Sequence, residues 1–168
     1  MNPKIAREAT KSLVGFLVDD VQYALPVELV REVTNPVPTV LLPHAPSAVV
    51  GVMDYRGAIV TVVDLRTRFG LQKVEPTRKT KWIVVDLSGR TLALVVDAVT
   101  EVFGTTRDDL RMAPWLGGGD ALGVAGVANR GGLVFLLDVA ALRELAEPSS
   151  RSIETRGKPS HALPEGSP

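Results

Sequence analysis

The chain has 168 residues, 45% of them hydrophobic and 23% charged, which is enough to bury a core and remain soluble. Its 19 lysines and arginines balance 19 aspartates and glutamates, and this neutrality excludes a general attraction to nucleic acid or anionic lipid. The absence of cysteine excludes disulfides and thiolate chemistry. We expect a cytoplasmic protein, because the polar N-terminus has no signal-peptide core and no apolar run reaches the roughly 20 residues that span a bilayer.

The first half of the chain is divided into short apolar runs by turn residues. The runs that predict strands are residues 12–18, 21–25, 31–34, 49–53 and 58–65. Asp19-Asp20 links the first two runs as a hairpin turn, and Arg56-Gly57 lies at the turn between the last two. Pro26 favours a helical turn directly after it, and the prolines between residues 36 and 46 predict a rigid loop without a long helix.

The second half restarts this pattern after a polar segment centred on Pro76. Its predicted strands are residues 82–87, 91–96, 98–103, 122–128 and 133–137. Hairpin turns are predicted at residues 88–90 and 129–132. Strands at this spacing are typical of small barrels or a sandwich. We therefore expect an all-β fold of two packed five-stranded barrels, the first over about residues 12–75 and the second over about residues 76–147.

One short helix is predicted near the C-terminus. Asp138 is a suitable N-cap for residues 139–146, in which apolar side chains share one face, and Pro148 ends the segment. Residues 148–168 are rich in serine, proline and charge, so we expect a disordered tail there. Residues 1–11 are expected to be a flexible N-terminus.

No constellation of residues predicts catalysis, a cofactor or a metal site. The two histidines, His44 and His161, lie far apart in the chain, whereas a metal needs several ligands held together. Two alternative functions stay open on the residues alone: an enzyme with a shallow site at Glu32, Arg56 and Asp64, and an RNA-binding small barrel. The neutral charge and an aromatic content of only 5% count against RNA binding, because stacking platforms need aromatic side chains.

Four separated segments resemble the CheW-like domain family. Residues 21–34 (VQYALPVELVREVT) are similar to its YALP…VREI segment, and residues 53–66 (MDYRGAIVTVVDLR) are similar to its NLRG…PVVDLR signature. Residues 94–114 resemble its second-half segment, and residues 126–145 resemble its closing hairpin and helix. The resemblance covers residues 12–147, which is nearly all of the expected folded chain.

The resemblance implies two SH3-like barrels and a non-enzymatic adaptor. Family members couple the cytoplasmic tip of methyl-accepting chemotaxis receptors to the histidine kinase CheA in membrane-associated receptor arrays. A stand-alone adaptor is favoured, because the sequence has no counterpart to the kinase's ATP-binding portion or to a receiver domain. The chain departs from the family pattern at Asp54-Tyr55, where Asn-Leu is commoner, and at Thr61, where proline is frequent. These departures leave open which receptor and kinase are served, and an adaptor for a non-flagellar chemosensory system remains an alternative.

The resemblance also implies two binding surfaces on a protein that is monomeric when isolated and that contacts neither nucleic acid nor the membrane interior. The receptor-contact residues are Glu32 and Arg56, with a hydrophobic groove between the barrels lined by Val30, Val33, Val95 and Val99. The kinase-contact residues, in the proline-rich loop, are Val37, Thr39, Leu41 and Leu42. On the residues alone, two alternatives carry equal weight. Arg56 is then only a solvated turn residue, and the proline-rich loop folds back and buries its leucines.

Overall fold

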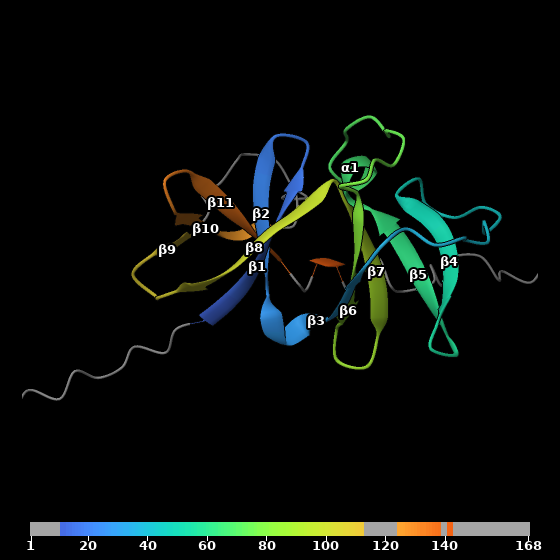
Figure 1. Ribbon diagram of the computed structural model, residues 1–168, viewed down its shortest axis with the longest axis horizontal. Helices are drawn as coiled ribbons and strands as arrows, with labels where there is room; N and C mark the ends of the chain where they lie inside the picture. The colour runs from blue at the N-terminus through green and yellow to red at the C-terminus, as the bar shows by residue number, and fades with distance from the viewer. Residues whose placement is uncertain (1–10, 113–123, 139–140, 143–168) are drawn as a thin grey trace, which may run out of the picture.

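The computed structural model describes residues 11–112, 124–138 and 141–142, and it contains two β-sheets that lie side by side (Figure 1). These residues form eleven strands, six in one sheet and five in the other. The prediction of an all-β fold of two packed SH3-like barrels is confirmed, although one sheet has six strands instead of five. Apart from Lys11 and residues 141–142, the predicted N-terminus, C-terminal helix and tail lie outside the described residues.

The six-stranded sheet combines both ends of the described chain. In spatial order its strands are β8 (Ala98–Thr105), β1 (Lys11–Val18), β2 (Val21–Pro26), β11 (Leu133–Leu137), β10 (Val124–Asn129) and β9 (Leu110–Met112). Figure 1 shows the blue β1 and β2 beside the orange β10 and β11. The two pairs are joined where β2 runs parallel to β11, with Tyr23 opposite Phe135.

The five-stranded sheet comes from the middle of the chain. In spatial order its strands are β3 (Val30–Thr34), β6 (Lys81–Asp86), β7 (Thr91–Val96), β5 (Ala58–Asp64) and β4 (Val49–Tyr55). The 3₁₀-helix η1 (Val27–Leu29) follows Pro26, as predicted, and leads from β2 into β3. The short helix α1 (Leu65–Arg68) follows β5, and the carboxylate of Asp64 caps it by accepting the Arg66 backbone N–H at 2.8 Å.

The pairing of the strands contradicts the predicted division of the chain at Pro76 into barrels of residues 12–75 and 76–147. β1 pairs with β8 and β2 pairs with β11, so strands from the second half complete a sheet that the first half begins. The local turns were predicted correctly: each predicted hairpin turn joins two adjacent antiparallel strands. Turn residues specify a hairpin, but they carry no information about which hairpins later share a sheet.

Three hydrophobic clusters form because alternate residues of a strand point to opposite faces of its sheet. The central cluster, between the sheets, comprises Phe16, Val18, Leu25, Ala48, Val63, Leu65, Ile83, Val85, Leu87, Leu92, Leu94, Val96, Leu137 and Leu142. We call the barrel of the six-stranded sheet the first barrel and that of the five-stranded sheet the second barrel. The first-barrel cluster comprises Leu13, Ala24, Phe103, Ala128 and Val134. The second-barrel cluster comprises Met53, Val60, Val62, Trp82, Val84 and Ala93. Each sheet is therefore covered on both faces, and the barrels cannot separate without exposing the central cluster.

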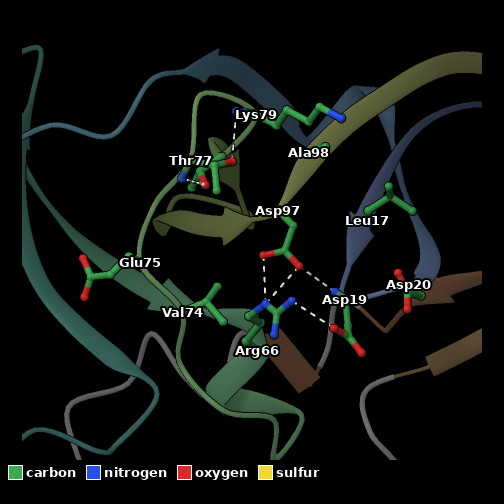
Figure 2. A pocket seen from close by; sticks show the side chains of 11 residues that line it. Leu17, Asp19, Asp20, Arg66, Val74, Glu75, Thr77, Lys79, Asp97 and Ala98 are labelled. Atoms are coloured by element: carbon green, nitrogen blue, oxygen red, sulfur yellow. Dashed lines mark hydrogen bonds and ion pairs between the residues drawn. The ribbon is translucent and has the colours of Figure 1, made fainter.

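A polar contact lies at one end of the interface between the barrels (Figure 2). Arg66 of α1 donates from Nε to both carboxylate oxygens of Asp97, each at 2.9 Å, and from Nη2 to Asp19 at 3.0 Å. Asp97 lies where the chain passes from β7 of one sheet to β8 of the other, and Asp19 lies in the β1–β2 turn. The Arg66 side chain is only 17% exposed, so this contact is shielded from water more than an ordinary surface ion pair.

We predict that Arg66→Met lowers the free energy of unfolding by about 1–2 kcal/mol, because it leaves two carboxylates without their shared donor. The measurement is urea unfolding followed by fluorescence. Arg68→Met is the matched control, since Arg68 lies on the same helix and no ion pair joins it to another described residue. Equal effects of the two substitutions would show that the contact with Asp97 and Asp19 contributes nothing to stability.

Candidate functional site

The turn between β4 and β5 presents Arg56 in an unusual backbone conformation. Arg56 has φ 54° and Gly57 has φ 83°, the positive values that a two-residue type I′ hairpin loop requires. Asp54 steadies the turn by accepting the Gly57 N–H at 2.9 Å. A left-handed conformation costs a non-glycine residue roughly 1–2 kcal/mol, so the arginine occupies this turn against a backbone preference. Such a position is a reason to look for a function of its side chain.

Arg56 and Tyr55 both donate to one carboxylate oxygen of Glu32. The Tyr55 hydroxyl and the Arg56 Nη2 each lie 2.9 Å from Glu32 Oε2, and the guanidinium lies 5.3 Å from the centre of the Tyr55 ring. Glu32 is on β3 and Tyr55 is on β4, the two edge strands of the five-stranded sheet. The polar triad, which we define as Glu32, Tyr55 and Arg56, therefore closes the second barrel.

The polar triad remains accessible to a partner. The Arg56 side chain is 74% exposed and that of Glu32 is 37% exposed. The hydrogen bond from Tyr55 lowers the pKa of Glu32, and Arg56 lowers it further, so the carboxylate stays ionised at neutral pH. The same hydrogen bond raises the pKa of Tyr55, which keeps its proton. An ion pair this exposed contributes little to stability, so its charges are available for binding.

The four valines of the predicted groove do not share one face. Val33 pairs with Ile83, a central-cluster residue, and direct partners across a sheet point to the same side. Val30 and Val99 also pack against the central cluster, whereas Val95 packs against the second-barrel cluster on the opposite face. The prediction of one groove lined by all four is therefore wrong for Val95. The physical reason is that successive residues of a strand face opposite sides of its sheet. The sequence shows this alternation, but it does not show which side of the sheet packs against the other barrel.

The proline-rich loop holds its apolar side chains in solvent. Leu41 is 77% exposed, and Leu42 and Val37 are also exposed, while Thr39 is half-buried. The backbone of Val40 pairs with Val52 of the edge strand β4, with both N–O distances at 2.9 Å, so the loop is attached although its leucines are not buried. The alternative in which the loop folds back and buries them is wrong.

Gly51 allows this close approach of the loop to β4. A Cβ atom at position 51 would lie 2.4 Å from the Val40 carbonyl oxygen, so any larger residue would push the loop away. Val40 itself and Ile59 of β5 are also exposed, and neither was among the predicted contact residues. The sequence carried a signal for Ile59, because it alternates with the buried Val60 along an apolar strand.

A cleft of about 270 Å³ lies between the barrels beside Arg66, and Figure 2 shows Asp19 and Asp97 on its wall. None of the predicted contact residues lines it. The contact of Arg66 with Asp97 and Asp19 was not predicted from the sequence. The only indication of it in the sequence is an arginine that closely follows Asp64, the buried last residue of β5.

Asp64, a member of the alternative catalytic site, is buried and caps α1 by accepting the Arg66 N–H and, at 3.3 Å, the Thr67 hydroxyl. No group of three histidine, aspartate or glutamate side chains in the described ranges is placed to hold a metal ion. No helix in the described part of the chain is long and apolar enough to cross a bilayer.

Two joined barrels with an accessible polar triad and a solvent-exposed apolar loop have the features of a protein-binding module. The chain belongs to the CheW-like domain family, whose model matches residues 12–147. It is 34% identical over 104 residues to the chemotaxis protein CheW of Rhizobium meliloti (strain 1021), covering 62% of this chain and 67% of that protein. It is 28% identical over 111 residues to a probable chemotaxis protein CheW of Rhizobium etli, covering 66% and 72% of the two chains.

A solved structure supports the same fold. The scaffolding protein TtCheW from Thermoanaerobacter tengcongensis superposes with a TM-score of 0.72 and 28% sequence identity. The match covers 77% of this chain and 89% of that one, so the two-barrel arrangement extends over nearly the whole of the scaffold's structure.

Proposed function

We propose that this protein is a non-enzymatic adaptor that couples chemoreceptors to the histidine kinase CheA in a chemotaxis or motility pathway. The observation that carries the proposal is the contact between Glu32 and Arg56, which joins two family motifs far apart in the sequence at one exposed point. Membership of the CheW-like family and the likeness to chemotaxis and scaffolding proteins support it. The adaptor works in the cytoplasm as a monomer that joins receptor arrays at the membrane.

The receptor surface is the polar triad together with the exposed Val33. Arginine and tyrosine are enriched at the energetic centres of protein interfaces, since they combine a large contact area with directional hydrogen bonds. Val33 follows Glu32 on the edge strand β3 and is also exposed, but it faces the opposite side of the sheet, since Val33 pairs with Ile83 and Glu32 pairs with Val84. A helical receptor tip that lies along this sheet edge can contact Val33 on one side of β3 while its polar groups meet Glu32 and Arg56 on the other.

We predict that Arg56→Ala weakens binding of a receptor cytoplasmic fragment at least tenfold, because an interface arginine of this kind is worth about 1–2 kcal/mol or more. The melting temperature should stay nearly unchanged, since the side chain is 74% exposed. Titration calorimetry measures the affinity, and Lys73→Ala is the control for losing an exposed positive charge elsewhere. A lowered melting temperature with intact binding would show that Arg56 stabilises the fold and does not contribute to receptor binding.

A charge exchange separates barrel closure from recognition. The double variant Glu32→Arg with Arg56→Glu keeps an ion pair between β3 and the β4–β5 turn but reverses the charges that a receptor meets. We expect it to restore the stability lost by Glu32→Arg alone and to leave receptor binding impaired. Full binding by the double variant would mean that the pair only closes the barrel.

The kinase surface is the apolar loop that lies along the edge strand β4. Its exposed residues are Val37, Val40, Leu41 and Leu42, and Ile59 of β5 is exposed in the same sheet. Exposed apolar surface of this kind marks protein-binding sites, because each Å² left in water costs about 25 cal/mol. We assign this surface to the CheA domain that is homologous to this chain, with Thr39 at its margin.

We predict that Leu42→Asp lowers the affinity for CheA at least tenfold, because it places a charge in the apolar interface. The fold should be preserved, since Leu42 is 45% exposed. Leu71→Asp is the matched control, because Leu71 is 37% exposed and lies in a different loop. Surface plasmon resonance with immobilised CheA measures both. Wild-type affinity of the Leu42 variant would exclude this loop from the kinase surface.

A further inference from the structure

We infer that Tyr55 is a specificity-determining residue that holds Glu32 and Arg56 in one preassembled unit, in which Glu32 Oε1 accepts a hydrogen bond from the receptor. The inference deepens the proposed function and rests on it, because it concerns the same surface. It assigns a positioning role to a residue at which this chain departs from the commoner leucine of the family pattern.

The arrangement of donors around Glu32 leaves one oxygen available. Tyr55 and Arg56 both donate to Oε2, at 2.9 Å each. No hydrogen bond from another described residue reaches Oε1. A guanidinium has five N–H donors, and within the described chain Arg56 uses its Nη2 in this contact. The triad therefore presents an acceptor, Oε1, directly beside the remaining N–H donors of Arg56.

Tyr55 is suited to fix this geometry. Its ring is half-buried and packs against the second-barrel cluster, so the core holds the position of its hydroxyl. Glu32 and Arg56 are long, flexible side chains that lose rotamer freedom when a partner binds. The Tyr55 hydroxyl restrains the carboxylate, and the ring restrains the guanidinium through the 5.3 Å cation–π contact. Ordering both groups in advance reduces the entropy lost on binding. A leucine at position 55 could pack but could not donate.

The charges around the polar triad nearly cancel, so the geometry of its hydrogen bonds is what discriminates between receptors. Arg31 of β3 pairs with Asp86 at the end of β6, beside the pair of Glu32 and Arg56. These two cations and two anions balance, and the exposed Asp54 of the same turn adds one negative charge, so the net charge offered to a partner is small. A receptor is therefore selected more by a donor placed opposite Oε1 and an acceptor placed opposite Arg56 than by long-range attraction.

The test compares Tyr55→Phe, which removes only the hydroxyl, with the wild-type full chain. The probe is a soluble cytoplasmic fragment of a chemoreceptor from the same genome, and calorimetry measures its affinity. Carbon-13 NMR of the free protein measures the pKa of the Glu32 carboxyl. We expect a three- to tenfold weaker affinity and a raised Glu32 pKa, because one hydrogen bond to the carboxylate is lost. Tyr55→Leu should weaken binding at least as much.

Tyr23→Phe is the matched control, since Tyr23 packs against the central cluster and its hydroxyl makes no hydrogen bond to another described residue. It should change neither affinity nor the Glu32 pKa. An unchanged pKa in Tyr55→Phe would refute the positioning of Glu32, and a raised pKa with unchanged affinity would limit Tyr55 to barrel closure. Both outcomes leave the proposed function standing. A wild-type protein that binds no receptor fragment would instead refute the proposed function and, with it, this inference.

Discussion

The apolar side chains packed between the two sheets hold both barrels in one orientation. Burying one large side chain such as Phe16 or Leu94 contributes about 1.5–3 kcal/mol, and the central cluster contains many of them. The polar contact of Arg66 with Asp97 and Asp19 is smaller in energy, but it is directional. The cluster therefore provides the stability of the two-barrel unit, and Arg66 specifies how the barrels are aligned at one end of their interface.

Barrel closure and the proposed receptor surface use the same residues of the second barrel. Glu32 and Tyr55 lie on the two edge strands of the five-stranded sheet, so the contact that joins these edges also forms the exposed polar triad. An edge strand needs protection from unwanted pairing, and here polar side chains and the attached loop provide it. The loop protects β4 through Val40 while its leucines stay exposed. Both proposed partner surfaces therefore lie on the edges of one sheet.

Much of the local structure was predictable because turn chemistry acts over a few residues. The hairpin at Asp19-Asp20 and the helical turn after Pro26 follow from the local preferences of their residues, whereas at Arg56-Gly57 only the glycine favours the positive φ that the turn requires. The approach of Glu32 to Arg56 was implied only by the family resemblance, which places both at a receptor surface. No local rule brings β3 beside β4, because the two strands occupy opposite edges of the sheet and meet only when it curls.

The sequence by itself determined the all-β class, the positions of the turns and the candidate pair at Glu32 and Arg56. The tertiary structure decided which strands share a sheet, since the parallel pairing of β2 with β11 joins segments from opposite ends of the described chain. It also decided that Val95 faces away from Val33 and that Leu41 stays in solvent. These outcomes depend on long-range packing. The pattern of apolar residues predicts that a side chain is buried, but only the assembled sheets determine which residues it packs against.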